Sequence, residues 1–300
     1  MQDVIKRFYN YIVAVQRYSE NTKQSYQNDV DSFASFLSIT YQIHSINEIS
    51  HFHIRSWIVK QMEAGLTVRS INRKISALST FFKYLKRFEG LESDPLKKIV
   101  RPKASKRLPI TVPKNDLVHP ILKDVDTNAS YSKVMEEMLI MLLYCTGIRR
   151  SEIINLKESD LDKERMVLRI FGKGKKERYI PVNSTLVEKI ETFIAFKHRC
   201  INEIVNENIF LTESGKPLYP KMVYNIVNRF LNTIPNLERR SPHILRHTFA
   251  THLVDAGADI NAVKMLLGHS SLAATQVYMH SSAERLKAVY QNAHPRSGKE

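Results

Sequence analysis

A proline-containing basic segment most strongly limits how this chain can fold. Residues 97–113 contain three prolines together with six lysine or arginine side chains. Prolines interrupt helices and strands, and like charges placed close together repel one another, so this segment is unsuited to a packed core. It therefore predicts two domains, residues 1–96 and residues 114–300, each long enough to bury its own core, with a basic linker between them.

The first domain is expected to be a small helical bundle. Apolar residues recur at helical spacing after Ser19, which suits an N-cap, and again across residues 51–62 and 70–88. Lysine and arginine side chains surround the apolar face of the last stretch. These periods predict a helical bundle with basic edges.

The second domain is expected to be mainly helical, with one small antiparallel β-sheet. Residues 166–170 and 178–182 alternate and are rich in β-branched side chains, and Gly172-Lys173-Gly174-Lys175-Lys176 lies between them. This pattern predicts a hairpin with a glycine-rich basic tip. Helices are predicted up to residue 144 and at residues 151–156, 186–200, 219–231, 242–256, 260–267, 272–280 and 283–292. The predicted fold is therefore mostly α.

The net charge favours a polyanionic partner. Lysine and arginine number 45 against 30 aspartates and glutamates, a formal net charge of +15 at pH 7, and both domains share the excess. An excess of positive charge most often indicates that a protein binds nucleic acid. A generically basic cytosolic protein would have the same composition. The hydrophobic content of 43% is that of a globular chain and excludes a disordered one.

The cysteines and the apolar runs exclude further classes. Cys145 and Cys200 have no CxxC partner, so neither a disulfide framework nor a thiolate zinc site is expected. No apolar run approaches the roughly 20 residues of a membrane helix, and the N-terminus lacks the pattern of a signal peptide. We expect a cytoplasmic protein without membrane contact.

His243 and Arg246 form the first candidate site. They lie three residues apart at the start of a predicted helix, and so on one face of it. A helix start also favours anions, so the pair predicts a phosphate pocket. A surface arginine beside a capping histidine is the plainer alternative. A zinc site of His243 with His247 lacks a third ligand at standard spacing, and no metal is expected.

Arg149 is the second candidate. It follows Thr146-Gly147-Ile148 at the junction of two predicted helices, and Glu152 lies one turn further on. A carboxylate at that spacing can hold a guanidinium in a fixed plane and leave some donors for a ligand. The alternative is an exposed ion pair of little consequence.

Three more residues complete the set of candidates. Lys173 lies between glycines at the hairpin tip, which lacks the spacing of a nucleotide-binding loop, so we interpret it as a basic finger or an ordinary polar turn. Gly268 ends one predicted helix and exposes His269. Tyr278 lies near the end of the next predicted helix, where a single tyrosine is usually part of the core.

Taken in order along the chain, these residues resemble the tyrosine recombinase (integrase) family. Residues 241–253 (SPHILRHTFATHL) and 266–270 (LLGHS) are close to the family's most diagnostic strings. The resemblance extends from residues 18–22 to the end of the chain. The length and the tail at residues 283–296 look most like the Xer branch.

The resemblance implies a reaction. Tyr278 would attack a DNA phosphodiester and form a covalent 3′-phosphotyrosine, while Arg149 and Arg246 clamp the non-bridging oxygens. By the same resemblance His243 serves acid–base catalysis and His269 donates a hydrogen bond to the phosphate. Lys173 delivers a proton to the leaving oxygen, and Glu152 orients the arginines. The implied enzyme needs no metal, no ATP and no other cofactor.

The resemblance also implies partners. The two domains would clamp double-stranded DNA, with the linker along its backbone. The candidate DNA-binding residues are Arg69, Arg73, Lys74, Arg101, Lys103, Lys106, Arg107, Lys175 and Lys176. A homo- or hetero-tetramer would act on two DNA sites, and a septal DNA translocase is a possible further partner.

The expected function is site-specific recombination that resolves chromosome or plasmid dimers at cell division. The alternatives are an integrase or invertase of a mobile genetic element, a type IB topoisomerase, and a non-catalytic DNA-binding protein. The amphipathic stretch at residues 283–290 suits packing into a neighbouring protomer or onto its own domain equally well.

Overall fold

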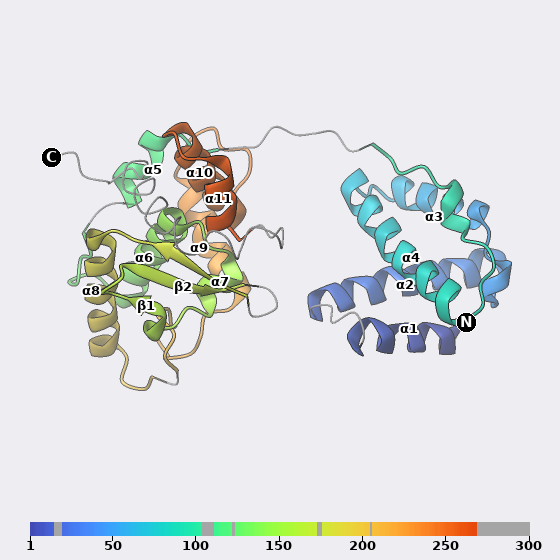
Figure 1. Cartoon of the computed structure of the whole chain (residues 1–300), viewed down its shortest axis with the longest axis horizontal. Helices are drawn as coiled ribbons and strands as arrows, with labels where there is room; N and C mark the ends of the chain where they lie inside the picture. The colour runs from blue at the N-terminus through green and yellow to red at the C-terminus, as the bar shows by residue number, and fades with distance from the viewer. Residues whose placement is uncertain (15–19, 104–110, 122–123, 173–175, 205, 269–300) are drawn as a thin grey trace. The chain divides into compact units, whose positions relative to one another are not determined.

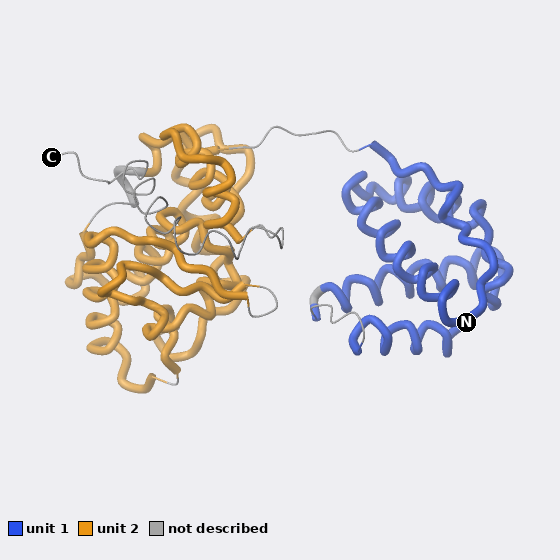
Figure 2. Tube along the Cα trace, in the orientation of Figure 1, with its two compact units in different colours: residues 1–107 blue, residues 108–300 orange. Residues whose placement is uncertain are grey.

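The computed structural model describes residues 1–300 except for 15–19, 104–110, 122–123, 173–175, 205 and 269–300. The chain forms two compact units, Met1–Arg107 and Leu108–Glu300 (Figure 2). Among the described residues, no helix combines the length and the apolar character needed to cross a membrane.

The first unit is a bundle of helices around an aromatic core. Its helices are α1 (Gln2–Ala14), α2 (Glu20–Tyr41), α3 (His51–Glu63) and α4 (Val68–Phe88), with short 3-10 turns at Ile46–Glu48 and Pro95–Lys98 (Figure 1). The ring of Phe33 meets that of Trp57 edge-on at 5.2 Å, and both are buried. Helix α1 lies outside the helical stretches predicted from the sequence.

Both flanks of the predicted linker are anchored. In the first unit, Asn72 Nδ2 donates to the carbonyl oxygen of Pro102 at 2.9 Å, and Arg101 Nη1 donates to Ser76 Oγ at 3.0 Å. In the second unit, Val112 is fully buried and its backbone N–H donates to Thr248 Oγ1 at 3.1 Å. The basic segment 97–113 is therefore attached to α4 at its start and to the second unit at its end.

The second unit is mainly helical with a small antiparallel sheet, which confirms the predicted fold class. Helix α6 lies at its centre, because every residue from Met138 to Ile148 is buried, and it packs against α8, α9 and α10 (Figure 1). The elements are α5 (Lys114–Ile121), α6 (Tyr131–Thr146), α7 (Arg150–Ile154), a 3-10 turn (Glu158–Asp160), β1 (Leu161–Asp162), β2 (Val167–Phe171), β3 (Glu177–Pro181), α8 (Ser184–Cys200), α9 (Pro220–Asn232), α10 (Pro242–Asp255) and α11 (Ile260–Leu266).

The sheet has the strand order β1-β2-β3. Strands β2 and β3 form the predicted hairpin, with Leu168 opposite Ile180 and Ile170 opposite Arg178. The three apolar residues of these pairs are buried, and residues directly opposite each other share a face of the sheet. Arg178 is therefore a charged residue on the face that packs against the core, where it needs a partner.

Two helix ends determine where the candidate residues lie. Gly147 ends α6 in the left-handed conformation at φ +61°, which turns the chain so that Arg149 stands immediately before α7. Pro242 occupies the first turn of α10, as its missing N–H allows. The predicted helices at residues 272–280 and 283–292 lie outside the described residues.

Candidate active site

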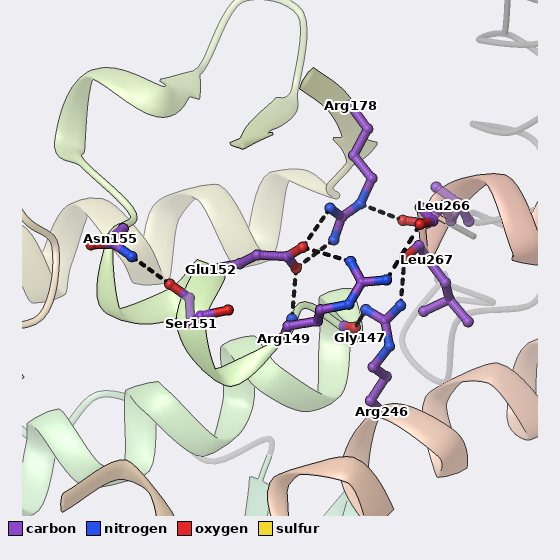
Figure 3. Close-up of polar contacts among 10 residues, drawn as sticks. Gly147, Arg149, Ser151, Glu152, Asn155, Arg178, Arg246, Leu266 and Leu267 are labelled. Atoms are coloured by element: carbon purple, nitrogen blue, oxygen red, sulfur yellow. Dashed lines mark hydrogen bonds and ion pairs between the residues drawn. The ribbon is translucent and has the colours of Figure 1, made fainter. Parts of the chain in front are cut away.

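Three arginines and one glutamate converge in the second unit (Figure 3). Arg149 comes from the α6–α7 turn, Glu152 from α7, Arg178 from β3 and Arg246 from α10. The structure thus brings together three residues predicted from the sequence and adds Arg178, which the sequence analysis did not select as a site residue.

Glu152 is the centre of this cluster. Its buried carboxylate accepts from the backbone N–H of Arg149 at 2.7 Å and from Arg149 Nη1 at 2.8 Å. The terminal nitrogens of Arg178 donate to the same two oxygens at 2.9 and 2.7 Å. Burial alone would raise the pKa of Glu152, but the hydrogen bonds and charges of the two arginines outweigh it and lower that pKa to about 2. Glu152 is therefore ionised at neutral pH.

Arg246 is the most deeply buried of the arginines, with 8% of its surface exposed. Its Nη1 donates to the carbonyl oxygen of Gly147 at 2.6 Å, and its Nη2 donates to the carbonyl oxygen of Leu267. Burial, together with the charges of Arg149 and Arg178, lowers the pKa of Arg246 to about 10, against the opposing charge of Glu152. The side chain stays protonated at neutral pH.

The three arginines also bind three consecutive carbonyl groups at the end of α11. Arg178 Nε donates to the oxygen of Leu266 at 2.7 Å, Arg246 donates to that of Leu267, and Arg149 Nη2 donates to that of Gly268 at 3.3 Å. The last carbonyls of a helix lack partners inside the helix and carry its negative dipole end. Cationic donors therefore stabilise the point where the chain leaves α11 towards residue 269.

The cluster has the charge and exposure of an anion site. The formal charges of three arginines and one carboxylate sum to +2. The side chain of Arg149 is 35% exposed, against 12% for that of Arg178, so Arg149 can best present donors to a ligand. A planar guanidinium suits the oxygens of a phosphate.

His243 is exposed in the first turn of α10, three residues before Arg246. The other predicted catalytic residues, Lys173, His269 and Tyr278, lie outside the described residues. Within the part of the chain that the structure describes, no three His, Cys, Asp or Glu side chains are grouped so that they could hold a metal ion.

The candidate DNA-binding residues differ in their surroundings. Lys106, Arg107 and Lys175 lie outside the described residues. Arg69, Lys103 and Lys176 are exposed.

Two other candidates are engaged with an acidic side chain of α2. Lys74 Nζ and Arg73 Nη2 each donate to Asp29 Oδ1 at 3.0 Å. The side chains of Asp29 and Lys74 are only 2% and 12% exposed, whereas that of Arg73 is 46% exposed. Lys74 is therefore held inside the first unit, while Arg73 remains accessible.

Family models match both units of the chain. The one described as the phage integrase family matches residues 114–285, and the one described as the phage integrase N-terminal SAM-like domain matches residues 5–89.

Curated relatives match along nearly the whole length. The chain is 33% identical over 302 residues to "Tyrosine recombinase XerC" of Bacillus subtilis (strain 168), covering 100% of this chain and 98% of that protein. It is 35% identical over 305 residues to the protein of the same name from Leptospira interrogans serovar copenhageni (strain Fiocruz L1-130), covering 100% and 95%.

Solved structures share the fold. The post-cleavage complex of the XerH site-specific recombinase bound to palindromic difH substrate has a TM-score of 0.69 at 24% identity, covering 89% of this chain and 78% of that chain. The Tn1549 transposon integrase (residues 82–397) in complex with circular intermediate DNA has a TM-score of 0.69 at 19% identity, covering 90% and 92%.

Proposed function

This chain belongs to the phage integrase family and is a tyrosine-type site-specific DNA recombinase, and we propose that the arginine cluster around Glu152 is its reaction centre. The observation that carries this proposal is the convergence of Arg149 and Arg246, two arginines 97 positions apart in the sequence, on consecutive carbonyl groups at the end of α11. Arg149 also pairs with the buried carboxylate of Glu152. The charges of the two arginines would hold the non-bridging oxygens of a DNA phosphodiester through the transition state.

The proposed nucleophile is Tyr278. Its phenolic oxygen forms a bond to phosphorus while the bond to the 5′-oxygen of the leaving strand breaks, which yields a 3′-phosphotyrosine and a 5′-hydroxyl. A free tyrosine has a pKa of about 10, so it needs a base, and His243 is the proposed acceptor of its proton. Lys173 would protonate the leaving oxygen, and His269 would donate to the phosphate.

The second half of the reaction reverses these bonds. A 5′-hydroxyl from the partner strand attacks phosphorus and releases the tyrosine. Because the phosphotyrosine link conserves the energy of the phosphodiester, the cycle needs no ATP. It needs no divalent metal either. The charge that a metal would supply in other phosphoryl transfers comes here from the arginines and lysine.

The proposed partner is double-stranded DNA, with four protomers on two sites as a homo- or hetero-tetramer. The net charge of +15 supports DNA binding. The name of the curated relatives supports a Xer-type role, in which recombination in the cytoplasm resolves chromosome or plasmid dimers at cell division. A septal DNA translocase is part of this proposal as a possible regulator.

Covalent trapping tests the proposed chemistry. The full-length protein is incubated, with EDTA and without ATP, with a nicked suicide duplex that carries a sequence it selects from a random library. We expect a covalent complex through the 3′ end. Tyr278→Phe should bind the duplex but form no such complex. Trapping by Tyr278→Phe, or a strict requirement for magnesium, would overturn the proposal.

Sequencing the trapped ends tests the biological role. A chromosomal or plasmid site present once per replicon fits dimer resolution. Ends that flank a mobile element would instead identify an integrase or invertase.

A further inference from the structure

Arg178 lies on the buried face of the sheet, where an arginine that contacts DNA would not be expected. It stands opposite Ile170 and two residues from Ile180, on the face of the sheet that packs against the core. Its side chain is only 12% exposed. A direct contact with the DNA backbone therefore does not explain it.

The donors of Arg178 are directed at protein groups. Nη1 and Nη2 bind the two oxygens of Glu152 at 2.9 and 2.7 Å, and Nε binds the carbonyl oxygen of Leu266 at 2.7 Å (Figure 3). Two parallel bonds between a guanidinium and a carboxylate form the strongest and most directional ion pair available to side chains. Arg178 thus determines the plane of the Glu152 carboxylate.

We propose that Arg178 is a positioning residue, which keeps Arg149 available to the scissile phosphate by neutralising Glu152 and holding the end of α11. This inference rests on the proposed function, in which Arg149 binds the phosphate. Glu152 accepts four hydrogen bonds, two from Arg149 and two from Arg178, which fills the capacity of a carboxylate.

The charge balance shows why the second arginine matters. With Arg178 present the cluster sums to +2, and Glu152 shares its charge between two guanidinium groups. Without Arg178 the sum falls to +1, and the carboxylate faces Arg149 as its one ion-pair partner within the cluster. An approaching phosphate would then compete with Glu152 for the same guanidinium.

Arg178 also connects three segments that lead to other proposed catalytic residues. It joins the β2–β3 hairpin to α7 through Glu152 and to the end of α11 through Leu266. Gly268 packs on it so closely that an added Cβ would lie 3.3 Å from Arg178 Cδ and 3.4 Å from Nη1. This contact sets the position of Gly268, the residue before 269, relative to the arginines.

A double-mutant cycle on the full-length protein tests this role. The probe is the nicked suicide duplex, and the readouts are the single-turnover cleavage rate at saturating DNA and the dissociation constant. Arg178→Gln should slow cleavage by about 10²-fold, because Arg149 would no longer be held in position to donate to the phosphate in the transition state. DNA affinity should stay within about threefold of the wild type. In a Glu152→Gln background the same substitution should cost less than about fivefold, since no carboxylate remains to be neutralised.

A matched control lies on the neighbouring strand. Arg169 pairs with the buried carboxylate of Asp160 at 3.1 Å, outside the cluster. Arg169→Gln removes another pair between an arginine and a buried carboxylate and should leave the cleavage rate within about twofold of the wild type. An equal loss from Arg169→Gln would show that only general stability is involved.

The outcomes separate the two proposals. If the wild type forms no covalent complex, the proposed function fails. If the wild type cleaves while Arg178→Gln matches it, or if Arg178→Gln costs the same in both backgrounds, the positioning role is overturned.

Should Arg178→Gln fail to fold by circular dichroism, Arg178→Lys decides the case. Lysine keeps the positive charge but lacks the planar guanidinium that binds both oxygens of Glu152. We therefore expect cleavage to be slowed by about three- to tenfold. An unchanged rate would contradict the proposal.

Discussion

The Nη1 atom of Arg246 lies 2.6 Å from the carbonyl oxygen of Gly147, two residues before Arg149. This hydrogen bond joins α10 to the turn between α6 and α7, so it sets the spacing of the two arginines. Gly147 has φ +61°, and a Cβ there would lie 2.3 Å from Phe249 Cδ1. Only glycine fits this turn without displacing the Phe249 side chain, which α10 carries.

Gly147→Ala should therefore damage both stability and cleavage. The positive φ costs about 1 kcal/mol for a residue with a Cβ, and the clash with Phe249 adds about 1–3 kcal/mol. We expect the unfolding transition of the second unit to move to lower urea concentration and single-turnover cleavage to fall by at least about tenfold. Urea denaturation followed by circular dichroism, with the suicide duplex for the rate, measures both effects.

Gly257→Ala is the matched control for that substitution. Gly257 also has a positive φ, +91°, in the same unit, but a Cβ there would meet nothing within 4 Å. Gly257→Ala should lose only the stability that the positive φ costs, and it should cleave DNA at the normal rate. Equal losses in the two variants would mean that the contact with Phe249 is unimportant.

The low pKa of Glu152 predicts how stability depends on pH. Its pKa falls from 4.5 to about 2 on folding, so its ionised form stabilises the folded state in full above pH 4.5, and this contribution is lost as the pH falls towards 2. The whole contribution is about 3 kcal/mol, of which about 2 kcal/mol is lost by pH 3.

Glu152→Gln isolates this effect. It should unfold more easily than the wild type at pH 6, and the difference in the free energy of unfolding between the two proteins should shrink by about 2 kcal/mol at pH 3. Urea denaturation at both pH values measures it. A difference that is the same at pH 3 and pH 6 would contradict the proposed ionisation.

Local periodicity was sufficient to predict most of the helices. The predicted ranges 186–200 and 219–231 correspond to α8 and α9, because each has a continuous apolar stripe of the helical period. Strand β1 has only two residues, too few for a pattern. Helix α1 carries Ile5, Phe8 and Ile12 at helical spacing, so the sequence does contain a local signal for it.

Long-range charge pairing was harder to predict. The pair of Arg149 and Glu152 is local, and its spacing is visible in the sequence. Arg178 meets Glu152 from a different element, 26 residues away, so no spacing rule connects them. The available signal was its position between the inward-facing Ile170 and Ile180, where an arginine requires a buried partner.

The same reasoning separates two basic residues that look equivalent in the sequence. Arg69 is exposed near the start of α4, whereas Lys74 is tied to the buried carboxylate of Asp29. Arg69→Gln should reduce the slope of log affinity against log salt by about 0.9, the value for one phosphate contact. Lys74→Met should leave the slope unchanged and destabilise the first unit by about 1–3 kcal/mol, because it removes an ion-pair partner of a buried carboxylate.

Fluorescence anisotropy of a labelled duplex across a salt series measures the two slopes, and urea denaturation measures the stability. A fall in slope for Lys74→Met equal to that for Arg69→Gln would show that Lys74 leaves Asp29 to bind DNA. Equal slopes for Arg69→Gln and the wild type would exclude Arg69 from the DNA contacts.

His252 links the end of the basic segment to the helix that carries Arg246. Its Nε2 lies 3.0 Å from the carbonyl oxygen of Val112, and its Nδ1 lies 3.0 Å from the hydroxyl of Tyr144. A carbonyl can only accept, so Nε2 carries the hydrogen and Nδ1 accepts from Tyr144. Burial lowers the pKa of His252 below its ordinary 6.5, although the bond to Val112 opposes this.

His252→Gln should therefore change the pH dependence of stability. Because the folded state favours the neutral ring, His252 stabilises the second unit above pH 6.5, and that contribution is lost as the pH falls below 6.5. The glutamine variant keeps a donor and an acceptor but cannot titrate, so its free energy of unfolding should decline less between about pH 7 and pH 5 than that of the wild type. Urea denaturation of both proteins over this range measures the effect. The difference between their free energies of unfolding removes the contribution of the other histidines, which both proteins share. Parallel curves for the two proteins would show that folding does not favour the neutral ring of His252, which would contradict this prediction.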